Sequence, residues 1–368
     1  MLQIRDITIR NLAGFMESDE FQRMEHIPIS PPRGFSQGKN PHASPDDRVL
    51  FLAYEDDRFI GYLGALPDVF YVAGSHFKVA WLSCMWVDPE MRRHGIAGKL
   101  LHHANEVWKS SLLISNFIPK SKAAFDKTGL FEPFMESKGI RGYIRFDIAQ
   151  ILITKKPSLQ KTAWLLKSLD VLLNIGNEIR LIFWRTLQTG LRVRLLDELD
   201  EVTSRFISTH NQFHLTRKGK EHFEWMKSAP WIIEEPYPGR DALRYDFSSS
   251  DKRFRQYWFT LSNTDGTPAA FLMLSLRGNH LKTPFVYFEK GNEANILRFL
   301  YAFMIRNRVR TFTTYHPALV SAVKTGRNPF LHTRKVTMES IITPGLKAKL
   351  GNTGNYYLQD GDGDAAFT

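Results

Sequence analysis

One stretch of the chain, residues 81–101, constrains the fold more than any other. It begins with the run Trp81–Val87, which is apolar apart from Ser83 and too short for a useful helix, so it predicts a buried strand. Pro89 follows this run, and the basic, glycine-bearing segment Arg92–Gly98 then opens a sequence with the apolar spacing of a helix. The stretch therefore predicts a strand, a loop and a helix in close succession.

The loop in this stretch has the chemistry of a phosphate site. A helix N-terminus presents unpaired backbone N–H groups and a partial positive charge. Small residues in the loop allow a ligand to approach the backbone, and the basic side chains beside them supply donors and charge. The residues concerned are Arg92, Arg93, His94, Gly95, Ile96, Ala97 and Gly98. They predict a site for a pyrophosphate, the alternative being an ordinary strand-to-helix turn that is basic.

The spacing Arg92-x-x-Gly95-x-Ala97, preceded by an apolar strand and Val-Asp-Pro, resembles the cofactor loop of the GNAT superfamily of N-acetyltransferases. The resemblance implies that the loop holds the diphosphate of acetyl-CoA, which is a co-substrate. It also implies that the strand backbone at Met85, Trp86 and Val87 faces the pantetheine arm. Neighbouring segments agree with the family's order of elements, and the resemblance covers roughly residues 1–150.

One position departs from the family. Many members carry a Tyr that protonates the departing thiolate, four residues before the Gly that corresponds to Gly129. This chain has Phe125 there, which has no proton to give. Another acid, a water molecule or the absence of acetyl transfer must therefore be considered. Asn116, near the expected acceptor cleft, is a weak candidate for catalysis.

The C-terminal segment 355–368 adds two further weak candidates, Asp360 and Asp362, which alternate with Asp364 between apolar residues. Ala365 stands where a calcium loop needs Gly, so no metal site is expected. Two interpretations stay open. The carboxylates hold or deprotonate an acceptor amine, or the segment is a disordered acidic tail.

The second half of the chain has the element order of the first. Strands, helices and a hairpin are expected at 254–263, 268–276, 285–289, 294–305, 311–315 and 317–324. The segment 290–295 lacks Arg and contains Glu293, so this copy is expected not to bind CoA. We therefore predict an α/β fold with a mixed sheet: two acyl-CoA N-acyltransferase-like domains in tandem. Residues 1–150 form the acetyl-CoA-binding domain, 151–200 a basic helical connector, and 201–368 the degenerate domain.

Positive charge is unevenly placed along the chain, and residues 151–196 hold eight basic and two acidic residues. Residues 1–150 contain 18 basic and 18 acidic residues, so the net charge of +11 falls entirely after residue 150. Residues 157–196 predict two helices with a break near 174–177. We favour a connector that packs across the joint between the domains. The alternative is a helix lying on a membrane surface, because the apolar sets have basic flanks.

These patterns lead to a main hypothesis, an acetyl-CoA-dependent N-acetyltransferase in which an acceptor amine attacks the thioester directly. The acceptor is a small molecule or glycan, such as an amino sugar or cell-envelope precursor. A non-catalytic acyl-CoA sensor or scaffold is the alternative, favoured by Phe125. The chain also resembles tandem acyltransferase-fold peptidyl transferases that use aminoacyl-tRNA, but those lack the pyrophosphate loop, so nucleic acid is not expected as a partner.

The remaining features limit the kinds of site and the compartment that we expect. Cys84 is the single cysteine, which excludes a disulfide within the chain and a multi-cysteine metal site. Neither a signal-peptide pattern nor an uncharged apolar run of transmembrane length is present, so a cytoplasmic protein is expected. The residues leave the acyl chain length and the oligomeric state open.

Overall fold

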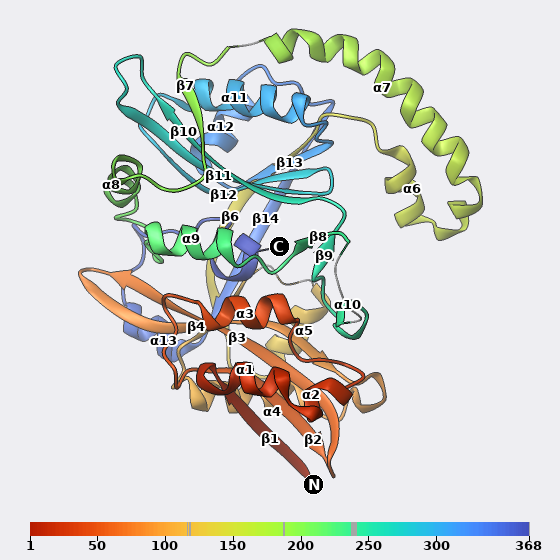
Figure 1. The fold of residues 1–368 in the computed structure, drawn as a ribbon, viewed down its shortest axis with the longest axis vertical. Coiled ribbons are helices and arrows are strands. Elements are labelled where there is room, and N and C mark those ends of the chain that lie inside the picture. Colours follow the sequence, from red (N-terminus) through yellow and green to blue (C-terminus); the bar gives the residue numbers. More distant parts are fainter. Residues whose placement is uncertain (116, 118, 187, 237–240, 368) are drawn as a thin grey trace. The chain divides into compact units, whose positions relative to one another are not determined.

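The computed structural model describes residues 1–115, 117, 119–186, 188–236 and 241–367 (Figure 1). The chain forms two compact units, each assembled from separate stretches of sequence. The first unit comprises Met1–Ser137, Glu198–Phe254 and Met338–Thr368, and the second comprises Lys138–Asp197 and Arg255–Thr337. These bounds interleave along the chain. They therefore differ from the three consecutive segments expected from the sequence.

The first unit is built on a sheet with the strand order β1-β2-β3-β4-β5-β14. Its N-terminal elements are β1 (Leu2–Thr8), α1 (Ile9–Glu17), α2 (Asp19–Arg23), α3 (Pro31–Gly38), β2 (Arg48–Glu55), β3 (Arg58–Val72), β4 (Ser75–Val87), η1 (Pro89–Met91), α4 (Ile96–Val107), β5 (Leu112–Ser115), α5 (Pro119–Asp126) and the start of β6 (Glu132–Tyr143). Its later elements are α8 (Glu201–His210), α9 (Lys220–Ser228), β8 (Ile233–Glu234), α10 (Asp241–Arg244), β9 (Ser250–Asp251), the end of β14 (His332–Ile342), α13 (Pro344–Leu350) and η3 (Gly363–Phe367).

Both faces of this sheet are covered, which explains the unbroken apolar run in β2. Side chains alternate across a strand: Phe51 and Ala53 join the core beneath α4, whereas Leu50 and Leu52 join the core beneath α1 and α2. All strand pairs on this side are antiparallel except β4 with β5, which is parallel. The predicted strand, loop and helix over residues 81–101 are confirmed as β4, η1 and α4.

The second unit repeats this plan with the order β6-β13-β12-β11-β10-β7. Its elements are the end of β6, α6 (Ile148–Lys155), η2 (Pro157–Thr162), α7 (Ala163–Thr186), β7 (Arg192–Leu196), β10 (Phe254–Ser262), β11 (Pro268–Arg277), β12 (His280–Phe288), α11 (Glu293–Arg306), β13 (Thr311–Thr314), α12 (Pro317–Thr325) and the start of β14. β12 and β13 are parallel, like β4 and β5. The predicted α/β fold with two acyltransferase-like halves is thus confirmed.

The last strand of each half pairs within the unit of the other half. In the first unit β5 pairs with the end of β14, with Ile114 opposite Ile341. In the second unit β13 pairs with the end of β6, with Phe312 opposite Gly142. This exchange is why the compact units interleave along the sequence. It also explains why boundaries read from element order alone differ from the units.

One local prediction needs correction, and one segment without a prediction forms a helix. The helix α3 begins at Pro31, where a proline is tolerated because the N–H it lacks would have no helical partner. The connector does not break near residues 174–177, because α7 runs through them. Asn174 and Asn177 instead donate side-chain hydrogen bonds to the carbonyls of Phe146 and Ile144, at 3.0 and 2.9 Å.

Asp170 performs a related task from the same side of α7. Its carboxylate accepts the backbone N–H groups of Ile148 and Ala149, at 2.7 and 2.9 Å, and so caps the first turn of α6. Asp147, the residue at the start of α6, makes no such side-chain bond. Within the described residues, no helix combines the length and the apolar character needed to cross a membrane.

We predict that Asp170→Ala loosens α6 without disturbing the rest of the chain. Two N–H groups lose their acceptor, and loss of a cap costs about 1–2 kcal/mol. Hydrogen exchange over residues 147–155 should accelerate accordingly. The control Ser168→Ala removes only an exposed hydroxyl of the same helix and should change nothing; equal exchange rates in both variants would contradict the capping role.

Candidate functional site

The candidate site begins where β4 and β5 separate. Their parallel pairing is limited to Ala80 opposite Leu112 and Trp81 opposite Leu113. β4 nevertheless continues to Val87 and stays paired with β3 on its other edge. Beyond Trp81 one edge of β4 therefore has no neighbouring strand among the described residues, which leaves its backbone groups available to a ligand.

A β-bulge lies in this open part of β4. Gly64 pairs with Ser83 and Tyr62 with Trp86, so two residues, Cys84 and Met85, stand opposite one residue of β3. Cys84 has a φ of +54°, which is rare for a residue other than glycine. Such a bulge bends the strand and re-aims its backbone.

The predicted phosphate loop follows directly. Gly95 has a φ of +78° and precedes α4 without any side-chain cap, so the first N–H groups of α4 lack a partner from the capping residue. A Cβ at Gly95 or Gly98 would meet no atom within 4 Å, so the surface there is open. Arg92 and Arg93 are exposed, and neither forms an ion pair with a carboxylate of the described chain. Arg92 Nε donates to Val87 O at 3.3 Å, which places this side chain beside the end of β4. Open backbone donors and cations without a carboxylate partner together suit an anion.

The other predicted strand residues lie beside this opening. Trp86 is buried, with its ring stacked on His26 at 4.6 Å and on Tyr62 at 5.8 Å between centroids. Met85 and Val87 pack against the core beneath α4. Their side chains are thus fixed by packing, which holds the strand backbone in place next to the loop.

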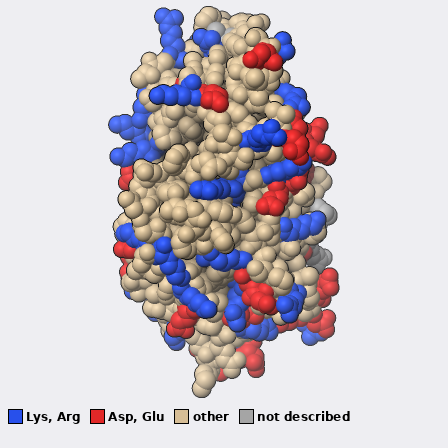
Figure 2. Space-filling view, turned by 90° about the vertical axis from the view of Figure 1, so that its left-hand side faces the viewer, with Lys and Arg blue, Asp and Glu red and all other residues tan. Residues whose placement is uncertain are grey.

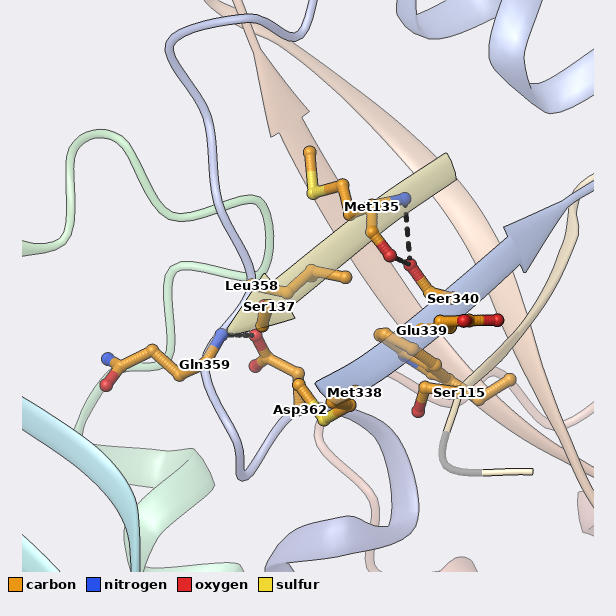
Figure 3. Close-up of a pocket in the computed structure, with 10 residues that line it drawn as sticks. Ser115, Met135, Ser137, Met338, Glu339, Ser340, Leu358, Gln359 and Asp362 are labelled. Atoms are coloured by element: carbon orange, nitrogen blue, oxygen red, sulfur yellow. Dashed lines mark hydrogen bonds between the residues drawn. The ribbon is translucent and has the colours of Figure 1, made fainter. Parts of the chain in front are cut away.

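A narrow pocket lies at the point of strand separation (Figure 3). Its volume is about 10 Å³, and it is lined by Trp81, Ser115, Met135, Ser137, Met338, Glu339, Ser340, Leu358, Gln359 and Asp362. Ser340 joins two of its walls, accepting from Met135 N at 3.2 Å and donating to Met135 O at 3.1 Å. The pocket thus combines β4, β5, β6, β14 and the C-terminal segment.

Asp362 is the most deeply buried charged residue of this pocket, at 3% exposure. It accepts hydrogen bonds from Thr216 Oγ1 at 2.6 Å and from Gln359 N at 2.7 Å. Burial raises the pKa of Asp362 to about 6, and the charge of Lys218 and the two hydrogen bonds offset only part of that rise. A carboxylate with such a pKa changes its proton readily near neutral pH.

The C-terminal segment is folded rather than disordered over the described residues. Residues 358–363 are buried, and Phe367 packs on the rings of Trp231 and Trp225 at 4.5 and 4.9 Å. The interpretation of residues 355–367 as a disordered acidic tail is therefore wrong. Asp360 is buried in the same segment but does not line the pocket.

A buried polar cluster supports this region from behind. Asp68 accepts from Lys218 Nζ at 2.7 and 2.8 Å, from Trp81 Nε1 at 3.0 Å and from His42 Nδ1 at 2.6 Å. Burial alone would raise the pKa of Asp68, but the Lys218 charge and the His42 hydrogen bond outweigh it, and that pKa lies well below its ordinary value. The cluster therefore fixes the ring of Trp81, which lines the pocket.

A second imidazole extends the cluster. Gly219 N donates to His222 Nδ1 at 3.2 Å, so the other ring nitrogen, Nε2, carries the proton and points at His42 Nε2, 2.8 Å away. Burial lowers the pKa of His222, with the charge of Lys218 acting in the same direction. The row His222, His42, Asp68 is thus a directed chain of hydrogen bonds between a neutral imidazole and a carboxylate.

A guanidinium contacts the bulge itself. Arg33, 2% exposed, donates to Cys84 Sγ, to Ser83 Oγ and to Tyr245 Oη, the last at 3.2 Å. Its planar head also lies over the ring of Trp231, at 4.3 Å. Arg33, Lys218 and Thr216 are not among the site residues predicted from the sequence, because nothing in their local spacing indicates a functional site. The unusual Pro- and Gly-rich composition around Arg33 was the only signal available.

The remaining candidates are placed as follows. Phe125 is buried in the core with Phe117 and Phe131, each at 6.1 Å between ring centroids, so it acts as a packing residue. Asn116 lies outside the described residues. Of the three weak catalytic candidates, the structure thus brings Asp362 into the pocket.

We predict that Asp68→Asn strongly destabilises the first unit. The substitution leaves the buried Lys218 ammonium without its counter-ion, and breaking a buried pair costs about 3–5 kcal/mol. Because the folded-state pKa of Asp68 is lowered, the stability it contributes is present above pH ~4 and is lost as the pH falls. Urea unfolding at several pH values measures both effects.

The matched control is Asp46→Asn, which breaks the exposed ion pair with Arg10. It should cost less than about 1 kcal/mol. A similar small loss for Asp68→Asn, without a change in the pH dependence, would show that Lys218 has another way to be neutralised.

Known proteins show which folds this chain resembles. No protein of curated function matches the chain. Among solved structures, a GCN5-related N-acetyltransferase from Anabaena variabilis has a TM-score of 0.50 at 10% identity, covering 93% of this chain and 72% of that one. A probable N-acyltransferase from Enterococcus faecalis has a TM-score of 0.49 at 9% identity, covering 93% and 73%. N-myristoyltransferase of Saccharomyces cerevisiae, with bound myristoyl-CoA, has a TM-score of 0.49 at 12% identity, covering 93% and 78%.

At 10% identity the likeness to the Anabaena protein concerns the fold alone. A family model gives more: the acetyltransferase (GNAT) family matches residues 15–112, which span α2, α3, the strands β2 to β4, the loop and α4. This segment contains the opened strand β4 and the basic loop described above. Residues 15–112 thus match the acetyltransferase (GNAT) family, in agreement with the resemblance of the loop.

Proposed function

We propose that this chain is an acetyl-CoA-dependent N-acetyltransferase whose acceptor is an amine. The observation that carries the proposal is one continuous arrangement in the first unit. The uncapped start of α4 follows a loop with two arginines that have no carboxylate partner, and this loop follows the open edge of β4. Trp81 of β4 also lines a pocket, which contains a buried carboxylate of raised pKa.

The co-substrate would be held by its two polar ends. The N–H groups at 95–98, with Arg92 and Arg93, suit the diphosphate, and the free edge of Met85–Val87 suits the amide groups of the pantetheine arm. When bound, acetyl-CoA supplies an activated acetyl thioester. The bulge at Cys84 directs backbone groups toward the opening, where a donor can stabilise the developing oxyanion.

Asp362 is proposed as the general base. An acceptor amine arrives as an ammonium ion and must lose a proton before it can attack. The carboxylate takes that proton, the nitrogen forms its bond to the acetyl carbon, and the bond to sulfur breaks. Because Phe125 has no proton to give, the thiolate must take its proton from another source; protonated Asp362 or solvent can supply it.

The pocket lining favours a cationic acceptor. Asp362 and Glu339 are its two carboxylates, and both attract an ammonium group. At about 10 Å³ the pocket has room for the amine end of an acceptor and not for the whole molecule, and the hydroxyls of Ser115 and Ser137 lie in its wall. A small-molecule or glycan amine, such as an amino sugar or a cell-envelope precursor, is therefore the acceptor class we propose.

Acetyl-CoA binding is the first test. Calorimetry should give a dissociation constant on the order of micromolar for the wild type, and Arg92→Ala/Gly95→Asp should abolish binding. The aspartate places a negative charge at the phosphate position, and the loss of Arg92 removes a cation. Myristoyl-CoA in the same assay tests the acyl length.

The matched control is Arg23→Ala/Gly74→Asp. Arg23 is exposed on α2, and Gly74 has a φ of +82° with no atom near its Cβ position, like Gly95. This control carries the same charge change and the same backbone strain away from the loop, so it should bind as the wild type does. Absence of binding to the wild type would refute the acetyltransferase proposal.

The role of Asp362 predicts a pH profile. Transfer at subsaturating acceptor should rise with pH through about 6 as the carboxylate ionises, and Asp362→Asn should lower the rate about 10²–10⁴-fold. Acetyl-CoA binding should be unchanged. Glu339→Gln removes an exposed carboxylate of the same pocket and should keep the inflection near pH 6. An inflection lost in Glu339→Gln but kept in Asp362→Asn would assign the base to Glu339.

Phe125 favours one second candidate, a non-catalytic acyl-CoA sensor. Its side chain is part of the core, so a proton donor is absent from that position. A sensor would bind acetyl-CoA in the calorimetric test without transferring it to any amine. Nucleic acid is not proposed as a partner; on the face in Figure 2, Lys and Arg lie among Asp and Glu.

A further inference from the structure

Helix α7 has an unusual polarity. Its side chains that are buried include Asp170 and Asn177, which are polar, together with Leu181. The polar groups are bonded to α6 and to the chain after β6: Asp170 to the N–H groups at 148 and 149, Asn177 to the carbonyl of Ile144. The middle of the helix is thus attached through polar side chains, whereas toward its end Leu181 and Trp184 pack against the apolar core of the unit. Its broad apolar face nevertheless points outward, which reverses the usual arrangement.

The apolar side chains of α7 point outward. Nine of them have exposed fractions between 43% and 70%: Trp164, Leu165, Leu169, Val171, Leu172, Ile175, Ile179, Ile182 and Phe183. At 3.6 residues per turn they fall within about 160° of the helix circumference, opposite Asp170 and Leu181. We call this set the outer face. No described residue covers it, and Figure 1 shows α7 as a long helix with α6 beside its start.

Cations lie beside the outer face. Lys167 and Arg185 lie along one border, and the preceding turn adds Lys156 and Lys161. Arg180 lies on the other side, where its guanidinium donates to Pro329 O at 2.7 Å and to Asn177 Oδ1 at 3.0 Å. All five are exposed. The acidic residues of the helix are Asp170, which is buried as a cap, and Glu178, which is paired with Arg145 at 2.8 Å. The border is therefore positive.

A cavity in the second unit opens on this border. Its wall includes Lys167, Val171 and Ile175 of α7, and Arg308 from the turn after α11. Among the described residues, neither Lys167 nor Arg308 forms an ion pair with a carboxylate. The carboxylates in the same wall have partners: Asp147 is paired with Arg310, Glu178 with Arg145, and Asp170 caps α6. The cavity thus offers Lys167 and Arg308 next to exposed apolar side chains. An anionic amphiphile has both matching parts, a charged head group and a hydrocarbon chain.

We infer that the outer face of α7 binds the surface of an anionic lipid bilayer. The helix lies along the interface, with its apolar side chains among the acyl chains and its border cations at the phosphates. It lies on the bilayer and does not cross it, in line with the absence of a spanning helix among the described residues. A second copy of the chain fits less well, because face-to-face pairing would bring the positive borders together.

Vesicle sedimentation with the full chain tests this inference. The wild type should bind vesicles of phosphatidylglycerol with phosphatidylcholine, and bind much more weakly to phosphatidylcholine alone. Leu172→Gln/Ile179→Gln should weaken binding at least about tenfold. Both side chains are exposed and glutamine is a good helix former, so the variant should fold. Lys161→Gln/Lys167→Gln should weaken binding on the order of fivefold for each cation lost and reduce its salt dependence.

The matched control is Val202→Gln/Leu243→Gln, which makes the same change at exposed apolar side chains of the first unit. It should bind vesicles as the wild type does. Three outcomes would overturn the inference: no binding by the wild type, equal binding by the Leu172/Ile179 variant, or a dimer in sedimentation equilibrium that the Leu172/Ile179 variant abolishes. The last would assign the outer face to a second copy.

Discussion

The separation of β4 from β5 is the constraint on which the rest of the first unit depends. Among the described residues, β4 pairs with β5 only at Ala80 and Trp81. Beyond this point β4 stays paired with β3, and β5 pairs with β14. The opening costs ladder bonds that a continuous sheet would keep, and a ligand backbone can replace them. The bulge at Cys84 and the uncapped start of α4 both follow this opening along the chain, so the proposed function is built on one local departure from a regular sheet.

The buried polar groups explain how such an opening is held in shape. Asp68 is hydrogen-bonded to Trp81, Lys218 and His42. It therefore connects β3 with β4, with the segment just before α9 and with the loop after α3. Lys218 lowers the pKa of Asp68, but it offsets only part of the rise that burial imposes on Asp362. Two aspartates near one lysine therefore have different proton affinities. One has the properties of a structural anion, and the other has those expected of a base.

Helix α7 shows how the same physics acts outside the site. An apolar face turned outward is unfavourable in water, yet the helix is fixed in that orientation by hydrogen bonds from Asp170, Asn174 and Asn177. Hydrogen bonds have direction, whereas apolar contacts do not, so the polar side decides which way the helix faces. The exposed side is then free to meet a surface of matching polarity, which is the basis of the lipid inference.

The sequence by itself determined the local elements and the cofactor loop. The repeated order of elements indicates the α/β fold. The apolar run before Pro89 and the basic glycine-bearing loop indicate the candidate CoA site, because strand, turn and helix signals are local. The tertiary structure alone decided the unbroken course of α7, the exchange of β6 and β14, and the buried cluster of Asp68, Lys218, His42 and His222. The exchange and the cluster depend on contacts between residues more than a hundred positions apart, such as Lys218 with Asp68. A chain has no local signal for a distant partner, since pairing is chosen by burial and charge in the folded core.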